Sequence, residues 1–160
     1  MKKINIRTLI IALTLPFVAG SIGSVATISS IPTWYALLIK PSFNPPNWLF
    51  GSVWTLLYVL MGVSLYLILK DWKGEKTQRK AVGIFILQLV LNSLWSIIFF
   101  GFKMPLPAFL EILILWFVIL LNINAFYKIN KISGILLIPY ILWVSFAGIL
   151  NFAIYYLNRI

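Results

Sequence analysis

The sequence contains no cysteine and no histidine, and only three of its 160 residues are acidic. The lack of cysteine excludes disulfides and thiol nucleophiles, and the lack of both residue types excludes the usual zinc and haem ligand sets. With Asp71, Glu75 and Glu111 as the only carboxylates, the chain has almost no material for a pair of catalytic acids. We therefore expect no cofactor and no metal site, and any chemistry would come largely from a bound ligand.

Charge of either sign is scarce, because 10% of the residues are charged and 62% are apolar. Soluble domains are about 25% charged and about 45–50% apolar. A helix needs about 20 apolar residues to cross a bilayer, so five crossings would use nearly the whole apolar share. This composition excludes a soluble globular domain and a disordered chain, and it predicts one membrane domain over residues 1–160.

Long runs without charge divide the chain into five predicted membrane spans. The spans cover residues 8–30, 47–69, 81–100, 105–127 and 133–157. Backbone groups in lipid must be satisfied within a helix or a closed barrel, and the chain shows no period-2 alternation, so helices are predicted. The segment 31–46 is rich in proline and aromatic residues and is expected to be a loop at the membrane interface. The predicted fold is an all-α bundle of five transmembrane helices.

The distribution of lysine and arginine predicts the orientation of this bundle. Ten of the 13 basic residues lie in the N-terminal segment and in the loops 70–80 and 127–132, whereas Lys40, Lys103 and Arg159 lie on the other side. The positive-inside rule then places the N-terminus in the cytoplasm of a multi-pass protein of the cell membrane. The net charge of +10 fits this orientation and attraction to anionic membrane lipid, and does not indicate a nucleic-acid partner.

An alternative concerns the first span, since a basic start, an apolar run and small residues near Ser24 and Ala26 are typical of a signal peptide. Cleavage there would leave four helices. The apolar run continues to Ile31, however, and Ala19, Gly23 and Thr27 recur every fourth residue. Small residues at this spacing are typical of a transmembrane helix packed closely against a neighbour, which favours five.

Three spans carry aromatic and polar residues at spacings of three and four, which place them on one face of a helix. The stripes are Trp54 and Tyr58; Gln88, Asn92, Trp95 and Phe99; and Tyr140, Trp143, Ala147 and Leu150, with Asn151 beside them. Asparagine and glutamine are costly in lipid unless they face protein, so the middle stripe is predicted to point inward. The stripes fit helix packing, and they also fit an aromatic-walled pocket for a flat apolar ligand.

Glu111 is the single acid within a predicted span. An ionisable residue at this depth is a candidate functional site. It also lies near the start of its span, where its side chain could reach the interface or Lys103. The sequence leaves both interpretations open.

Several motifs resemble the signature of the translocator protein family, also called tryptophan-rich sensory proteins or peripheral benzodiazepine receptors. They are Trp34-Tyr35, the segment KPSFNPPNW over 40–48, VWTLLY over 53–58, Met61-Gly62, QLVLN over 88–92 with Trp95 and Phe99-Phe100, and Pro139-Tyr140 with Trp143, Ala147 and Leu150-Asn151. The similarity extends over nearly the whole chain.

The resemblance implies a five-helix bundle, usually a homodimer, that binds porphyrins, sterol-like lipids and isoquinoline or benzodiazepine drugs in an intramembrane pocket under the loop 31–46. It assigns ligand contacts to Trp54 and Trp143, and in some bacterial members the corresponding tryptophans are associated with light-dependent porphyrin degradation. The other matching pocket positions are Tyr58, Asn92, Trp95, Ala147 and Leu150. A sterol motif is present only loosely, as Leu150, Tyr155 and Arg159.

Three functions remain open from the sequence: a sensory protein that binds a tetrapyrrole, a light-dependent enzyme that degrades it with Trp54 and Trp143, and a porphyrin or lipid transporter. An odd helix number and the lack of internal repeats fit a simple inverted-repeat transporter poorly. For a porphyrin, the two carboxylates cannot lie uncompensated in the apolar centre. Lys40 and Arg159 share one predicted side, and we expect them to anchor these carboxylates at the rim.

Overall fold

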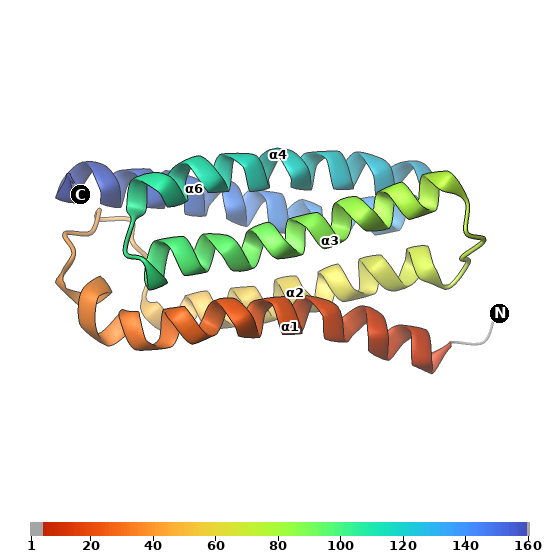
Figure 1. The fold of residues 1–160 in the computed structure, drawn as a ribbon, viewed down its shortest axis with the longest axis horizontal. Coiled ribbons are helices and arrows are strands. Elements are labelled where there is room, and N and C mark those ends of the chain that lie inside the picture. Colours follow the sequence, from red (N-terminus) through yellow and green to blue (C-terminus); the bar gives the residue numbers. More distant parts are fainter. Residues whose placement is uncertain (1–4, 160) are drawn as a thin grey trace.

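The computed structural model describes residues 5–159, which form a bundle of long helices and contain no strand (Figure 1). The helices are α1 (Ile6–Ser30), α2 (Asn47–Leu69), α3 (Lys76–Ser96), α4 (Pro105–Ile129), α5 (Lys131–Ile135) and α6 (Ile138–Asn158), with π-helical turns at Ile31–Tyr35 and Ile97–Gly101. Within the described residues, five helical runs are long and apolar enough to cross a membrane. The predicted all-α bundle of five membrane helices is confirmed.

The helices run along one common axis and pack against their neighbours lengthwise. Helix α1 contacts α2 and α3, and α4 contacts α3 and α6 (Figure 1). The N-terminal end of α1 lies at the same end of the bundle as the loop between α2 and α3, whereas the C-terminus lies at the other end beside the segment that joins α1 to α2 (Figure 1). Each end of the bundle therefore carries its own set of loops.

The predicted loop 31–46 begins later than expected, because the helix continues through a π-helical turn, Ile31–Tyr35. Pro32 lies in the first turn of this segment. Proline has no N–H and its ring crowds the carbonyl of the preceding turn, so an ordinary α-helix cannot continue unchanged. A wider π turn absorbs this change and extends the helix, which brings Tyr35 into the bundle, where it is buried.

The predicted fifth span is also interrupted, because Leu136 and Leu137 separate α5 from α6. Pro139 lies in the first turn of α6, where the missing N–H costs nothing since first-turn donors have no intrahelical partner. At the start of α5, the Asn130 side chain accepts a hydrogen bond from the Ser133 backbone N–H at 3.1 Å. The break therefore has a proline on its C-terminal side and a capped helix on its N-terminal side.

Small residues let α1 approach its two neighbours closely. A Cβ atom added to Gly62 would lie 2.8 Å from the Leu13 Cα atom, and one added to Gly23 would lie 3.0 Å from the Ser96 side chain. The Ser93 hydroxyl also donates a hydrogen bond to the Ala19 carbonyl at 2.8 Å. Close backbone approach of this kind is the usual basis of helix association in lipid, and it fixes α1 against α2 and α3.

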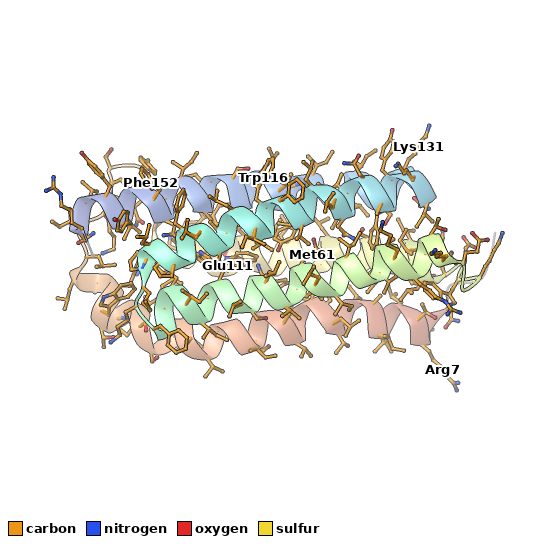
Figure 2. The ribbon with its side chains drawn as sticks, turned by 45° about the horizontal axis from the view of Figure 1, so that its top comes forward. Arg7, Met61, Glu111, Trp116, Lys131 and Phe152 are labelled. Carbon is orange, nitrogen blue, oxygen red and sulfur yellow. The ribbon has the colours of Figure 1, made fainter. Side chains whose placement is uncertain are left out.

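The stripe on α3 faces the interior. Gln88, Asn92 and Phe99 expose 0%, 3% and 2% of their surface. The predicted inward orientation of this stripe is therefore confirmed. Figure 2 shows that side chains fill the space between the helices along most of the bundle.

Candidate ligand pocket

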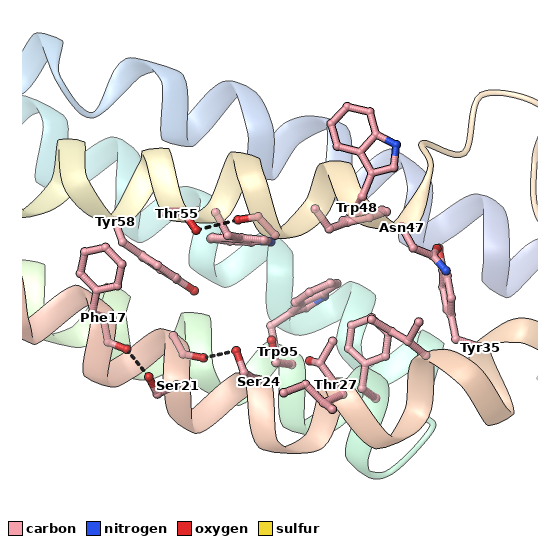
Figure 3. Close-up of a pocket in the computed structure, with 18 residues that line it drawn as sticks. Phe17, Ser21, Ser24, Thr27, Tyr35, Asn47, Trp48, Thr55, Tyr58 and Trp95 are labelled. Atoms are coloured by element: carbon pink, nitrogen blue, oxygen red, sulfur yellow. Dashed lines mark hydrogen bonds between the residues drawn. The ribbon is translucent and has the colours of Figure 1, made fainter.

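A pocket of about 430 Å³ lies between α1 and α2, with α3 as its floor (Figure 3). Its size is within the range of about 300–1,000 Å³ that is typical of small-molecule sites. The lining residues are Phe17, Gly20, Ser21, Ser24, Thr27, Ile28, Ile31, Tyr35, Asn47, Trp48, Phe50, Gly51, Trp54, Thr55, Tyr58, Trp95, Ser96 and Phe100. None of these residues is charged, so the pocket suits an apolar ligand with a few polar groups.

The position of the pocket follows from where α1 and α2 touch. The two helices meet closely at Gly62 and Leu13, and the Tyr58 ring lies against Gly20. Phe17 and Tyr58 stand at this closed end, whereas Tyr35 and Asn47 stand at the other end (Figure 3). The pocket therefore begins where the close helix contact stops.

One wall of the pocket is aromatic. The Trp54 ring is stacked with Tyr58, with 5.5 Å between ring centroids and 29° between planes. The Trp95 ring is stacked on Phe99 at 5.4 Å and 22°. Stacked and edge-on rings add roughly 0.5–1.5 kcal/mol per pair beyond the burial of their area. Rings that already hold each other in place give a flat ligand a preformed surface.

The opposite wall, formed by α1, carries hydroxyl groups. Ser21 and Ser24 each donate a hydrogen bond to a carbonyl one turn earlier, both at 2.8 Å (Figure 3), and Thr27 does so at 3.0 Å. Thr55 on α2 makes the same kind of bond at 2.8 Å (Figure 3). A hydroxyl has one donor and two lone pairs. Since the donor is used within the helix, the lone pairs are available to a ligand N–H or O–H group.

Hydrogen bonds behind the aromatic wall connect it to α3 and α6. The Tyr58 hydroxyl donates to Asn92 Oδ1 at 3.3 Å, and Asn92 Nδ2 donates to the Tyr140 hydroxyl oxygen at 3.3 Å. Trp95 Nε1 donates to Asn151 Oδ1 at 3.0 Å. These amides link two pocket rings to buried partners, and most buried polar groups in folded proteins are paired in this way.

The structure brings three of the predicted ligand residues into the lining of the pocket and leaves four out of it. Trp54, Tyr58 and Trp95 line the pocket, and Asn92 is the hydrogen-bond partner described above. The other residues that do not line it are Trp143, whose ring centroid lies 5.9 Å from that of the lining residue Phe50, and the buried Ala147 and Leu150. The indole N–H of Trp143 is buried and has no hydrogen-bond partner among the described residues.

The two predicted rim residues lie at the same end of the bundle, next to a contact between the loop and α6. Lys40 Nζ lies 4.8 Å from the centre of the Tyr35 ring and donates to the carbonyls of Ala36 and Leu38 at 3.3 and 3.2 Å. Asn158, the neighbour of Arg159, donates to the Ile39 carbonyl and accepts from the Ile39 N–H, both at 2.9 Å. Because Tyr35 lines the pocket, Lys40 lies close to its end.

Sequence reasoning missed the wall formed by α1. Ser21, Ser24, Ile28 and Ile31 recur at spacings of three, four and three, which is the same signal that marked the aromatic stripes. Hydroxyl residues inside an apolar span draw less attention because each can satisfy its own donor within the helix. The spacing alone could have identified this face.

Glu111 is not part of the pocket. Its side chain is 7% exposed and lies within the bundle (Figure 2). Neither carboxylate oxygen has a hydrogen-bond partner among the described residues. Of the two interpretations that the sequence leaves open, the one in which Glu111 reaches Lys103 or the interface is not borne out, because the side chain turns into the interior. The loose sterol motif is likewise divided, since Leu150 is buried while Arg159 is exposed.

Known proteins resemble this chain over nearly its whole length. Residues 12–157 match the profile of the TspO/MBR family. The chain is 42% identical to the tryptophan-rich protein TspO of Chlorobaculum tepidum, covering 96% of this chain and 98% of that protein, and 45% identical to the protein of the same name from Archaeoglobus fulgidus, covering 96% and 99%. It is 32% identical to the translocator protein of Bos taurus, covering 91% of this chain and 87% of that protein.

Proposed function

Because the chain belongs to the TspO/MBR family, we propose that this multi-pass integral membrane protein is a sensory protein that binds a porphyrin between α1 and α2. Its expected location is the cell membrane, with the N-terminus in the cytoplasm. One observation carries the proposal: an uncharged pocket of about 430 Å³ has an aromatic wall facing a hydroxyl wall. A flat macrocycle can stack on the aromatic wall, while polar groups at its edge meet the hydroxyl wall.

The pocket geometry suggests how a porphyrin is held. The macrocycle stacks against Trp54 and Trp95, and hydroxyl oxygens of α1 accept from its polar hydrogens. The two carboxylates require a cation, because an uncompensated charge in the apolar centre is costly. Among the described residues, Lys40 donates to two backbone carbonyls near the end of the pocket, so it can turn to a carboxylate, with Arg159 as the second anchor.

The proposal extends to other flat apolar molecules. Sterol-like lipids and isoquinoline or benzodiazepine drugs present rings to the same aromatic wall and need little charge compensation. The homodimer that the family resemblance implies is also part of the proposal. Many large apolar side chains on the outer helix faces are exposed, for example Leu87 and Val90 on α3, and a second copy or lipid would cover them.

Two glycines provide a matched test of the pocket. A Cβ atom added to Gly51 or to Gly83 would meet no atom within 4 Å, but only Gly51 lines the pocket. We expect Gly51→Leu to fill the pocket and weaken protoporphyrin binding by about tenfold or more, since one leucine occupies a large part of the space needed for stacking. Titration of protoporphyrin into the purified protein, followed by tryptophan fluorescence quenching, measures the affinity.

Gly83→Leu is the control, and its affinity should equal that of the unmodified chain. Equal weakening by both variants, or by neither, would contradict the assignment of the pocket. Trp54→Phe supplies a second measure, with an expected loss of about two- to tenfold for one stacked ring. Trp143→Phe should have a smaller effect, because Trp143 contacts the lining residue Phe50 and does not line the pocket itself.

A second candidate function is light-dependent breakdown of the bound porphyrin, with dioxygen as the oxidant. The stacked pair Trp54 and Tyr58 at the pocket wall favours it, because these rings would hold an excited macrocycle in a fixed position. Singlet oxygen formed by the excited porphyrin would add across a double bond of the ring, and both oxygen atoms would end as carbonyl groups of the opened product. Porphyrin loss at equal rates in light and darkness would reject this candidate.

A further inference from the structure

A second hollow lies between α3 and α4, at the end of the bundle where α2 is joined to α3. Its volume is about 710 Å³. Its polar rim consists of Asp71, Lys73, Glu75, Thr77, Gln78, Lys80, Asn124 and Lys128, and its apolar floor consists of Ala81, Ile84, Leu121, Ala125 and Ile129. We call this hollow the α3–α4 groove.

The loop at the rim of the groove is held in one conformation by a buried amide. Gln78 is 6% exposed, and its Oε1 atom accepts from the Lys73 backbone N–H at 2.8 Å while its Nε2 atom donates to the Asp71 carbonyl at 3.1 Å. Arg79 Nε donates to the Gly74 carbonyl at 2.9 Å. Gly74 adopts a positive φ of 74°, which suits glycine. Lys73 is therefore presented at the groove by an ordered turn.

The chemistry of the groove changes along its length. Three ammonium groups stand at the rim: Lys73 precedes α3, Lys80 lies near the start of α3, and Lys128 lies in the last turn of α4. Methyl-rich side chains follow further along α3 and α4. This order, cationic at the interface and apolar below, matches an anionic head group attached to an acyl chain. Basic pockets between transmembrane helices bind lipid head groups by the same combination.

We propose that the α3–α4 groove is a binding site for an anionic phospholipid of the surrounding leaflet. The phosphate lies among Lys73, Lys80 and Lys128, and an acyl chain lies along Ile84 and Ala125. Glu75 at the same rim accepts a hydrogen bond from a head-group hydroxyl, which favours phosphatidylglycerol over phosphatidic acid. A free phosphate ion would leave the apolar floor uncovered, so a lipid fits the groove better than a soluble anion does.

Lipid selectivity of the full chain tests this proposal. The protein is placed in phosphatidylcholine vesicles that contain spin-labelled phosphatidylglycerol or spin-labelled phosphatidylcholine, and electron paramagnetic resonance measures the immobilised fraction of each. We expect phosphatidylglycerol to be preferred. Replacing Lys73, Lys80 and Lys128 together by Gln should lower this preference by about fivefold or more, since each basic group near an anionic surface contributes substantially.

The matched control replaces three exposed basic residues of the same end that do not line the groove, Lys70, Lys76 and Lys131, by Gln. It removes the same charge and should retain most of the preference. Equal losses in the two triple variants would show a diffuse surface effect and overturn the proposal. A preference for phosphatidylglycerol that is retained in both triple variants would also overturn it. So would displacement of the spin-labelled phosphatidylglycerol by millimolar inorganic phosphate.

A variant that keeps all charges tests the floor. Ala125 is partly buried and lines the groove, so Ala125→Phe places a ring where the acyl chain is proposed to lie. The preference for phosphatidylglycerol should fall at least threefold while the thermal midpoint in detergent stays within a few degrees. An unchanged preference in this variant would show that no acyl chain occupies the groove.

Discussion

At the scale of single residues, the buried serines show how polar side chains stabilise this bundle. Ser30 donates to the Phe100 carbonyl at 2.6 Å and Ser93 to the Ala19 carbonyl at 2.8 Å. Ser64 and Ser133 form a reciprocal pair, because each hydroxyl lies within hydrogen-bond distance of the other residue's carbonyl, at 2.8 and 2.7 Å. Each of these bonds joins different helical segments. The hydroxyls therefore stabilise the association of helices in lipid, where apolar side chains contact lipid tails as favourably as they contact another helix.

The reciprocal pair predicts a non-additive double-mutant cycle. Ser64→Ala and Ser133→Ala should each lower the free energy of unfolding by about 1 kcal/mol, because interhelical hydrogen bonds in membrane proteins contribute roughly 0.6–2 kcal/mol. The double variant should lose less than the sum of the two, since both changes remove the 3.0 Å contact between the two hydroxyl oxygens. Unfolding in mixed micelles with increasing sodium dodecyl sulfate measures all four proteins. Strict additivity would contradict the pairing.

At the scale of whole helices, glycine and proline decide where α1 and α2 touch and where they enclose the pocket. Gly62 meets Leu13 backbone to backbone, whereas Pro32 changes the helix to a π turn that brings Tyr35 into the bundle. The pocket lies between these two places. A helix contact and a helix irregularity therefore define its two ends.

Two alanine substitutions test the close contact between α1 and α2. Gly62→Ala should destabilise the protein by about 1–3 kcal/mol, the usual cost of forcing a methyl group into a filled space, because its Cβ atom would lie 2.8 Å from the Leu13 Cα atom. Gly83→Ala meets no atom within 4 Å and should be neutral or stabilising by up to about 1 kcal/mol through helix propensity. The same detergent unfolding assay serves for both, and equal stability of the two variants would contradict the proposed contact.

The sequence predicts these helices better than it predicts the pocket between them. Charge-free runs indicated five membrane helices because lipid excludes charge and requires internal backbone bonding. The stripe on α3 correctly placed Gln88, Asn92 and Phe99 on an inward face, and the structure places Trp54, Tyr58 and Trp95 at the pocket. The spacing of a stripe cannot tell whether its face meets a cavity or another helix. Trp54 lines the pocket, whereas Ala147 is buried and does not line it. That difference depends on close approaches such as Gly20 to Tyr58, which involve residues 38 positions apart.

At the scale of the whole molecule, the C-terminus holds the loop that follows α1. Asn158 exchanges two hydrogen bonds of 2.9 Å with the Ile39 backbone, across 119 positions of the sequence. The Tyr35 hydroxyl donates to Asn44 Oδ1 at 2.8 Å, which fixes a second point of the same segment. The segment 36–46 is therefore tied at the end of the bundle where Tyr35 closes the pocket.

Removing the tie from α6 should loosen this segment without unfolding the bundle. In Asn158→Ala, amide hydrogen exchange over residues 38–44 should become about tenfold faster, because local opening no longer breaks two hydrogen bonds. Asn124→Ala is the control, since the Asn124 amide donates to the Leu120 carbonyl of its own helix. Mass spectrometry measures amide exchange over this segment in both variants. Unchanged exchange in Asn158→Ala would contradict this role of Asn158.

Because one wall of the pocket is exposed on the outer side of the bundle, the affinity for a ligand is best expressed against the ligand's concentration in the lipid. Ser21, Ser24 and Thr55 line the pocket yet remain exposed on the outer side of α1 and α2, the side that faces acyl chains in a bilayer. A ligand that reaches the pocket from there first dissolves in the bilayer, so its binding follows its mole fraction in lipid. Doubling the lipid at fixed protein and ligand would halve that mole fraction and raise the apparent dissociation constant, with every protein contact unchanged.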